Sequence, residues 1–146
     1  FYIGGTKNGA MLGEAVIIMN ERLKDDFRFF LKQKGALLAK SRIFGLQFVE
    51  LFKDDLFFKL AEHANAMAIK LSRSIEKMGF QFLCESVTNQ IFPIFNQKII
   101  NSLSKKYGFY VWENMDNTNS AIRIVTSWAT KEEAIDGFIK DLKACV

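Results

Sequence analysis

Apolar residues at the start of the chain form short runs of about strand length. Residues 1–3 read as the end of a strand, and residues 15–19 form a continuous apolar run suited to a strand covered on both faces. Three glycines stand between them, within residues 4–9, and predict a tight loop where the backbone approaches something closely. A glycine-rich loop between two buried strands is a favourable place to bind a ligand.

Helical periodicity follows after residue 20. Apolar residues recur at helical spacing over residues 23–35, where Gly35 provides a stop. Residues 41–53 predict a second helix with so little polar surface that it must be buried, against the first sheet or against a partner subunit. A third helix is expected over residues 56–78, because apolar residues recur there in steps of three and four, and Gly79 can end it.

After Gly79 the pattern changes to short strands and shorter helices. Strands are expected at residues 80–84, 91–95, 109–112 and 121–126. Pro93 restricts the second of them to a sheet edge or an irregular strand. A short helix is expected over residues 97–105, and the sequence TKEE at 130–133 matches a capping box that starts a last helix. Residues 80–146 therefore predict a small antiparallel sheet with helices packed on one side.

These elements divide into two parts, residues 1–55 and 56–146. The chain has 146 residues, of which 49% are hydrophobic and 25% charged, as is ordinary for a packed protein. It opens in mid-strand on Phe1, without a methionine. We therefore expect it to be a piece of a longer protein.

Charge and cysteine content exclude several classes of partner. The formal net charge is +4, but basic residues are scattered among acidic ones, so no stripe for nucleic acid is formed. No apolar run reaches the roughly 20 residues that span a bilayer. With one histidine, His63, and two cysteines, Cys84 and Cys145, no metal site is expected. Reduced cysteines fit a cytoplasmic protein.

Lys7 is the residue with the clearest chemical potential. It lies between Thr6 and Asn8 in the glycine loop, next to apolar strands. Partial burial there would disfavour its charged form and make it a better amine nucleophile, as Schiff-base chemistry with a carbonyl cofactor requires. On spacing alone, an ordinary solvent-exposed loop lysine is the simpler interpretation, because short loops of glycine and lysine are common.

Three separated blocks of sequence carry a family resemblance. They are FYIGGTKNGA followed by GEAVII in residues 1–18, QKGALLAKSR in residues 33–42 and AIRIVTSW in residues 121–128. In this order they resemble the threonine aldolase and β-eliminating lyase family, pyridoxal-phosphate enzymes of the aspartate aminotransferase fold. The resemblance implies an α/β chain: the end of the large cofactor domain of that fold, followed by a small C-terminal α+β domain with an antiparallel sheet.

The same resemblance assigns roles to individual residues. Lys7 matches the lysine that binds pyridoxal phosphate covalently, and Thr6 matches a position where a hydroxyl could help hold the phosphate. Arg123 matches the arginine that grips the substrate's α-carboxylate, a task suited to a planar guanidinium. In the second block the better-known members carry a glycine run followed by an arginine, whereas this chain has Lys40-Ser41-Arg42. We assign the phosphate contact to Lys40, with Arg42 as the alternative; surface charges are the other interpretation of both.

The implied function is aldol cleavage of threonine-like β-hydroxy amino acids to glycine and an aldehyde, by a homo-oligomer (dimer or tetramer). Two alternatives remain open: a β-eliminating lyase of the same fold, and a non-catalytic α+β interaction fragment that uses the Phe-rich segment 43–52 as its contact face. In the family, the phosphate-binding loop, the ring that stacks on the cofactor and the aspartate at the pyridine nitrogen come earlier in the chain. We therefore expect this chain alone to be inactive.

Four other residues receive structural interpretations. His63 falls beside the apolar stripe of the long helix, with no partner in the sequence to orient it, and is expected at the edge of the core. Cys84 alternates with phenylalanines and is expected to be a small buried hydrophobe. Trp112 and Trp128 are expected to pack the small domain.

Overall fold

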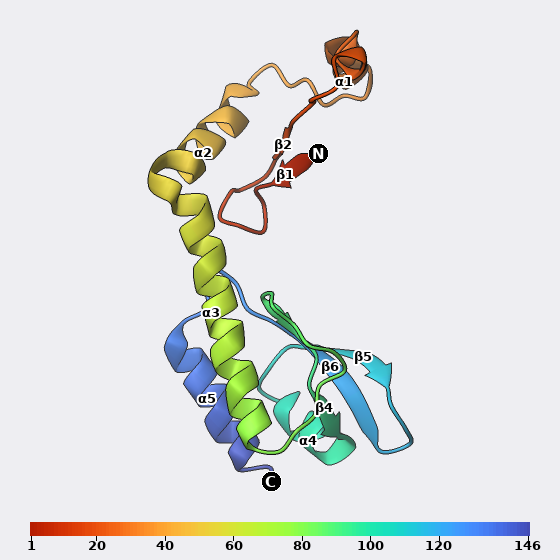
Figure 1. Cartoon of the computed structure of the whole chain (residues 1–146), viewed down its shortest axis with the longest axis vertical. Helices are drawn as coiled ribbons and strands as arrows, with labels where there is room; N and C mark the ends of the chain where they lie inside the picture. Colours follow the sequence, from red (N-terminus) through yellow and green to blue (C-terminus); the bar gives the residue numbers. More distant parts are fainter. The chain divides into compact units, whose positions relative to one another are not determined.

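The computed structural model describes all 146 residues, which form two compact units (Figure 1). The first unit comprises Phe1–Lys59 and the second Leu60–Val146. The division lies inside α3 (Leu56–Lys77), so one helix belongs to both units. Each unit is described by itself below. No helix of the chain combines the length and the apolarity needed to cross a membrane.

The first unit begins with a two-stranded antiparallel ribbon. Strand β1 (Tyr2–Gly4) pairs with β2 (Glu14–Val16), and Ile3 lies opposite Ala15. The expected strand at 15–19 is therefore shorter than predicted, and the expectation of burial on both faces is wrong, because Val16 is 54% exposed. The physical reason is that the ribbon has only two strands, so most of its surface stays uncovered within this chain.

Three helical segments follow the ribbon. The predicted helix at 23–35 is broken into a 3₁₀ turn, η1 (Glu21–Leu23), and a short helix, α1 (Phe27–Gln33). Asp26 adopts a left-handed conformation (φ 53°) between them, which interrupts the helical hydrogen bonds. The predicted second helix is confirmed as α2 (Arg42–Phe52), but only its Leu51 is buried. The expectation that α2 is a buried helix is not met within this chain.

The long helix α3 is confirmed nearly to the residue. Its buried residues, Ala64, Ala68, Leu71 and Ile75, follow one another in steps of three and four. A 3₁₀ turn, η2 (Lys53–Asp55), precedes it. At its other end Gly79 has φ +85°, a conformation that side chains with a Cβ rarely adopt, so glycine is the suitable residue there.

The second unit contains an antiparallel sheet built around β6 (Asn119–Val125). One edge of β6 pairs with β3 (Gln90–Ile91) and then with β4 (Ile94–Asn96), while the other edge pairs with β5 (Tyr110–Asn114). The predicted strand at 91–95 is therefore interrupted at Pro93, as expected for a proline. The predicted strand at 80–84 is wrong: only Phe82 forms a bridge, to Pro93.

Helices pack on one face of this sheet, as predicted (Figure 1). They are α3, α4 (Gln97–Leu103) and α5 (Glu132–Lys143). Their buried apolar residues form one core with Ile91, Phe95 and Ile122 of the strands. The predicted capping box is wrong, because Lys131 is the N-cap of α5 and makes no side-chain capping bond. The Thr130 hydroxyl instead accepts a hydrogen bond from the Ser127 amide at 2.8 Å.

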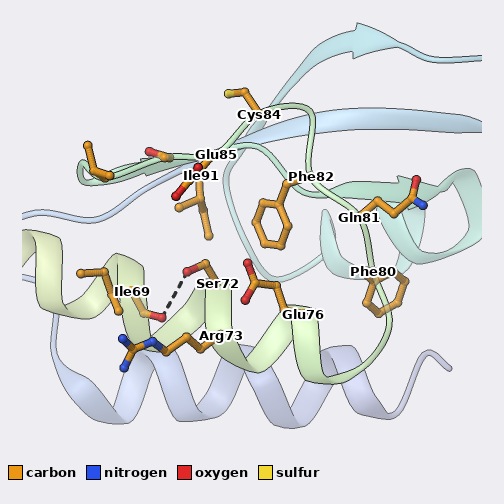
Figure 2. Close-up of a pocket in the computed structure, with 12 residues that line it drawn as sticks. Ile69, Ser72, Arg73, Glu76, Phe80, Gln81, Phe82, Cys84, Glu85 and Ile91 are labelled. Carbon is orange, nitrogen blue, oxygen red and sulfur yellow. Dashed lines mark hydrogen bonds between the residues drawn. The ribbon is translucent and has the colours of Figure 1, made fainter.

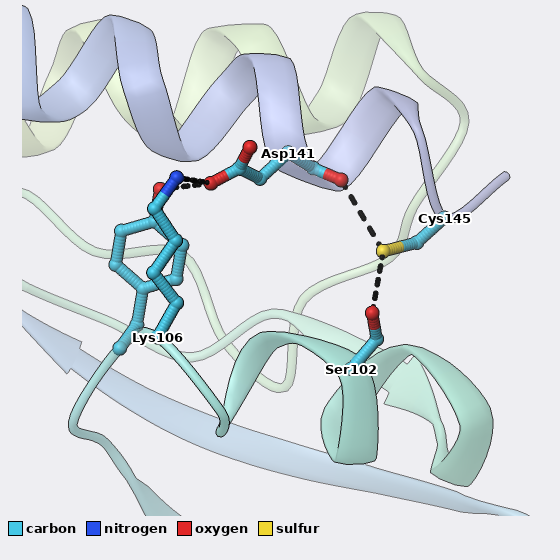
Figure 3. Close-up of polar contacts among 5 residues, drawn as sticks. Ser102, Lys106, Asp141 and Cys145 are labelled. Atoms are coloured by element: carbon cyan, nitrogen blue, oxygen red, sulfur yellow. Dashed lines mark hydrogen bonds and ion pairs between the residues drawn. The ribbon is translucent and has the colours of Figure 1, made fainter.

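Polar contacts join α5 to its neighbours. Asp141 accepts hydrogen bonds from the Lys106 ammonium and, at 2.5 Å, from the Tyr107 hydroxyl (Figure 3). The bond from Lys106, and to a smaller extent that from Tyr107, holds the pKa of Asp141 below its usual range. The Cys145 thiol lies 3.2 Å from the Asp141 carbonyl, to which it can donate, and 3.3 Å from the Ser102 hydroxyl. These contacts connect the end of α5 to α4 and to the segment that follows α4.

Candidate active site

The Lys7 loop, residues 5–13, is a tight turn closed by its own backbone. The amides of Asn8 and Ala10 both donate to the Gly5 carbonyl, at 2.9 and 3.0 Å, and the Gly5 amide donates to the Gly13 carbonyl at 3.2 Å. Lys7 stands within this turn, and its side chain is exposed. The glycine pattern therefore predicted the turn correctly.

Gly5 is required by close packing beneath the loop. A Cβ added at Gly5 would lie 2.8 Å from the Ala10 Cβ and 3.0 Å from Cζ of Phe48 in α2. Any larger residue would push the loop away from α2. The loop can thus lie against the helix only because position 5 has no side chain.

Side-chain hydrogen bonds anchor the Lys7 loop at two further points. Gln47 of α2 accepts from the Met11 amide at 2.7 Å and donates to the Leu12 carbonyl at 3.5 Å. The Asn8 amide group donates to the Phe57 carbonyl at 2.8 Å. The loop is therefore fixed by these anchors, while the Lys7 side chain is exposed.

The environment of Lys7 corrects one expectation. The predicted partial burial is not met, because both Lys7 and Thr6 are exposed in this chain. The anchors explain this, since the loop turns Gly5 and Asn8 toward the helices. Lys7 makes no ion pair, so its amine is unpaired.

Lys40 and Arg42 lie at the start of α2. Lys40 is in the turn that leads into the helix and Arg42 is the first helical residue; both are exposed and neither makes an ion pair. No hydrogen bond connects either of them to Thr6 or Lys7. The structure therefore does not favour one of the two as a phosphate contact.

Arg123 belongs to the second unit, in β6. Its partner across the ladder is Tyr110 of β5, and the guanidinium carbon lies 5.2 Å from the centre of that ring and 5.3 Å from the centre of the Trp112 ring. No acidic side chain pairs with it. Its Nε is the one buried side-chain nitrogen or oxygen atom of the chain without a hydrogen-bond partner.

An unpartnered buried N–H is unusual, because leaving one unsatisfied costs about 1–3 kcal/mol. A guanidinium pairs best with a carboxylate, through two parallel hydrogen bonds. The surroundings of Arg123 therefore fit a residue that receives a carboxylate from outside this chain.

A cavity of the second unit lies elsewhere, between α3 and the segment 80–91 (Figure 2). Its volume is about 700 Å³, and its charged lining includes Arg73, Glu76 and Glu85. The Ser72 hydroxyl, also at this cavity, donates to the Ile69 carbonyl at 3.1 Å. None of the predicted site residues lines this cavity. No group of three or more His, Cys, Asp or Glu side chains in the chain is placed to hold a metal ion.

Comparison with known proteins gives a consistent result. The solved structure of a Leishmania major threonine aldolase superposes with a TM-score of 0.95 at 42% sequence identity, over 99% of this chain. Low specificity L-threonine aldolases of Pseudomonas sp. (strain NCIMB 10558) and Pseudomonas aeruginosa are 30% and 29% identical, over 97% and 96% of this chain. The homologues of this chain are threonine aldolases. No protein-family model matches it.

The similarity to threonine aldolases covers part of those proteins. This chain spans 42% of the Leishmania chain and 40% of each Pseudomonas protein. The predicted α/β fold, with its antiparallel sheet in the second part, is confirmed as the fold of a threonine aldolase segment. The similarity is consistent with the C-terminal part of an aspartate-aminotransferase-like fold.

Sequence patterns alone did not identify the residues that contact Arg123 and the Lys7 loop. Trp112 was expected to pack the small domain, but it is 53% exposed and lies against Arg123. Tyr110 and Trp112 alternate on one strand, and this spacing was the signal that could have linked them to Arg123. Gln47 carries no such signal, because its contacts depend on how α2 folds back onto the loop.

Three other structural interpretations are also corrected. Cys84 is exposed, not buried, because its segment forms no regular strand. Trp128 is 44% exposed. His63 is exposed as well, and its Nε2 lies 2.8 Å from the Thr130 carbonyl, so it links α3 to the segment before α5.

Proposed function

We propose that this chain is the part of a pyridoxal-phosphate-dependent aldehyde-lyase that supplies the cofactor lysine, Lys7, and the carboxylate-binding arginine, Arg123. The threonine aldolase homologues support the reaction class. The observation that carries the proposal is the Arg123 guanidinium, which lies against two aromatic rings and has a buried Nε–H without an acceptor.

The residues of the first unit fit pyridoxal phosphate chemically. Lys7 offers an unpaired primary amine on an anchored turn, which can hold the cofactor through its carbonyl carbon. Thr6 offers a hydroxyl beside it, and Lys40 a cation suited to a phosphate. When bound, the cofactor supplies an electron sink for the bond that breaks at Cα.

Anchoring of the loop matters for this role. A reactive amine must keep its position while the substrate exchanges with it, and a displacement of about 1 Å can cost roughly 100-fold in rate. The bonds made by Asn8 and by Gln47 restrain the backbone that follows Lys7 without involving its amine. Lys7 therefore combines a fixed backbone with a mobile side chain.

Arg123 would bind the substrate. Its guanidinium can donate two parallel hydrogen bonds to an α-carboxylate in the guanidinium plane, which fixes one end of the amino acid. For threonine-like substrates, cleavage between Cα and Cβ then gives glycine and an aldehyde.

We also propose that the protein is a cytoplasmic homo-oligomer. The thiols of Cys84 and Cys145 are free, as suits a reducing compartment, and the exposed apolar face of α2 can be covered by another subunit.

The test is a product analysis with the full-length protein that contains this chain, loaded with pyridoxal phosphate. We expect acetaldehyde and glycine in equal amounts from L-threonine, with little ammonia. Release of ammonia and a keto acid would assign β-elimination instead. If neither reaction occurs, the result favours the alternative of a non-catalytic interaction fragment, with the exposed apolar residues of α2, Ile43, Leu46 and Val49, as its contact face.

A further inference from the structure

The outer face of the small sheet carries aromatic rings around Arg123 that the proposed function does not by itself explain. Tyr110 and Trp112 come from β5 and Arg123 from the neighbouring β6. The guanidinium carbon lies 5.2 Å from the Tyr110 ring centre and 5.3 Å from that of Trp112. Both separations are within the range of a cation–π interaction. One cation is therefore held between two rings from one strand.

A β-bulge lies at this point. The register between β5 and β6 shifts between Val111 and Glu113, so Trp112 has no partner of its own in β6. Bulges re-aim a side chain and are frequent next to functional sites. Here the indole of Trp112 lies over Arg123, although Tyr110 is the residue that pairs with Arg123.

Phe92 supports this arrangement from the opposite edge of β6. It lies between β3 and β4, and its ring centre is 5.3 Å from that of Trp112, with the planes inclined at 58°. An aromatic row thus crosses the sheet, with Arg123 within it.

Core packing does not account for the aromatic row. The helices cover the face that carries Ile91 and Ile122, and the apolar core is complete there. Tyr110 and Trp112 remain more than half exposed on the other face. Rings that stack on a guanidinium cover its flat faces and leave its N–H edge free to bind in the plane.

We propose that Tyr110 and Trp112 are positioning residues that hold the Arg123 guanidinium in the orientation that receives the substrate's α-carboxylate. This inference rests on the proposed function. Stacking restricts the long arginine side chain before the substrate arrives, so less conformational freedom is lost on binding. It also excludes water from the faces of the cation, which strengthens the ion pair with the carboxylate.

The test measures steady-state kinetics of the full-length enzyme loaded with pyridoxal phosphate, with L-threonine as substrate. We expect Trp112→Leu and Tyr110→Leu to raise KM roughly three- to tenfold, the loss of one cation–π contact, while kcat changes less than about twofold. Trp112→Phe and Tyr110→Phe keep the rings and are expected to retain most of the affinity. Trp128→Leu is the matched control, because Trp128 is exposed to a similar degree and its ring makes no cation–π contact with Arg123.

A double-mutant cycle separates positioning from a structural role. In an Arg123→Leu background, Trp112→Leu is expected to cause no further loss in kcat/KM, because the two side chains act as one unit. Equal losses in both backgrounds, or the same rise in KM for Trp128→Leu, would overturn the inference while the enzyme remains an aldolase. A full-length wild-type protein without lyase activity would overturn the proposed function and this inference together.

Discussion

Lys7 and Arg123 are made available for chemistry by opposite surroundings. Lys7 is exposed on a turn whose backbone is anchored, so its amine is accessible and the backbone that carries it is restrained. Arg123 lies against two rings and retains a buried N–H without an acceptor. The first arrangement suits a group that forms and breaks a covalent bond, and the second suits a group that binds a charge.

The phosphate contact can be assigned by comparing Lys40 and Arg42. We predict that Lys40→Ala weakens pyridoxal phosphate binding by the full-length protein roughly tenfold, because a charge-assisted contact is lost. Arg42→Ala should change the affinity less than about twofold. Absorbance titration of the apoprotein measures both dissociation constants, with Lys34→Ala as an exposed control. A larger loss for Arg42→Ala would transfer the role to Arg42.

At the scale of secondary structure, the sequence predicted the elements whose pattern is local. The 22 residues of α3 carry their own periodicity, and the helix forms where that pattern predicts. Residues 80–84 look equally apolar, but a strand also needs a neighbour. Here the pairing is limited to one bridge between Phe82 and Pro93, flanked by hydrogen bonds from the Leu83 amide to the Phe92 carbonyl and from the Ile94 amide to the Gln81 carbonyl, both 2.9 Å. The predicted capping box at Thr130 also fails because of a contact outside the local pattern. The Thr130 hydroxyl accepts a hydrogen bond from the Ser127 amide and does not cap α5.

The buried stripe of α3 gives a prediction about stability. Leu71 is 1% exposed within the core of the second unit, whereas Ile69 on the same helix is 38% exposed. We expect Leu71→Ala to lower the free energy of unfolding by about 2–5 kcal/mol. Ile69→Ala should lower it by less than about 1 kcal/mol. Urea unfolding followed by circular dichroism compares the two, and equal losses would contradict the assigned core.

The turn between β5 and β6 gives a prediction about pH. The Asp116 carboxylate accepts hydrogen bonds from the side chains and amides of Asn119 and Thr118, at 2.6–2.9 Å, and these bonds hold its pKa below the usual range. A depressed pKa stabilises the fold above the unfolded-state value of about 3.9, and this contribution is lost as pH falls through the folded-state value.

Asp116→Asn should therefore lower the Tm at pH 7, and the difference from wild type should shrink as the pH falls below about 4. Thermal melts at several pH values measure this, and Asp25→Asn serves as a control because Asp25 is exposed and makes no ion pair. A difference that stays constant down to pH 2 would show that the carboxylate charge does not stabilise the turn.

At the scale of the whole molecule, the three sequence blocks located the fold and its candidate residues, but not the surroundings of those residues. Exposure of Lys7 depends on the contacts of α2 with the loop, and the rings around Arg123 depend on the register of β5 and β6. Both depend on long-range pairings; the alternation of Tyr110 and Trp112 indicates only that the two rings share one face of their strand. The segment spans about two-fifths of its threonine aldolase relatives, which bears on what it can do alone.

We predict that the isolated 146-residue chain does not cleave L-threonine. It offers the amine of Lys7 and the guanidinium of Arg123, but the family places the phosphate-binding loop and the partner of the pyridine nitrogen earlier in the chain. Aldehyde release in the presence of pyridoxal phosphate should equal the background with cofactor alone, whereas the full-length protein should turn over. Saturable turnover by the isolated chain, abolished by Lys7→Ala, would contradict this.

The most direct test of the central claim is to trap the cofactor on its lysine. The full-length protein is loaded with pyridoxal phosphate, reduced with borohydride and digested, and the peptides are identified by mass spectrometry. We predict a phosphopyridoxyl group on Lys7, absent from the Lys7→Arg variant. A stable adduct on another lysine, with Lys7 unmodified, would show that Lys7 is not the cofactor residue.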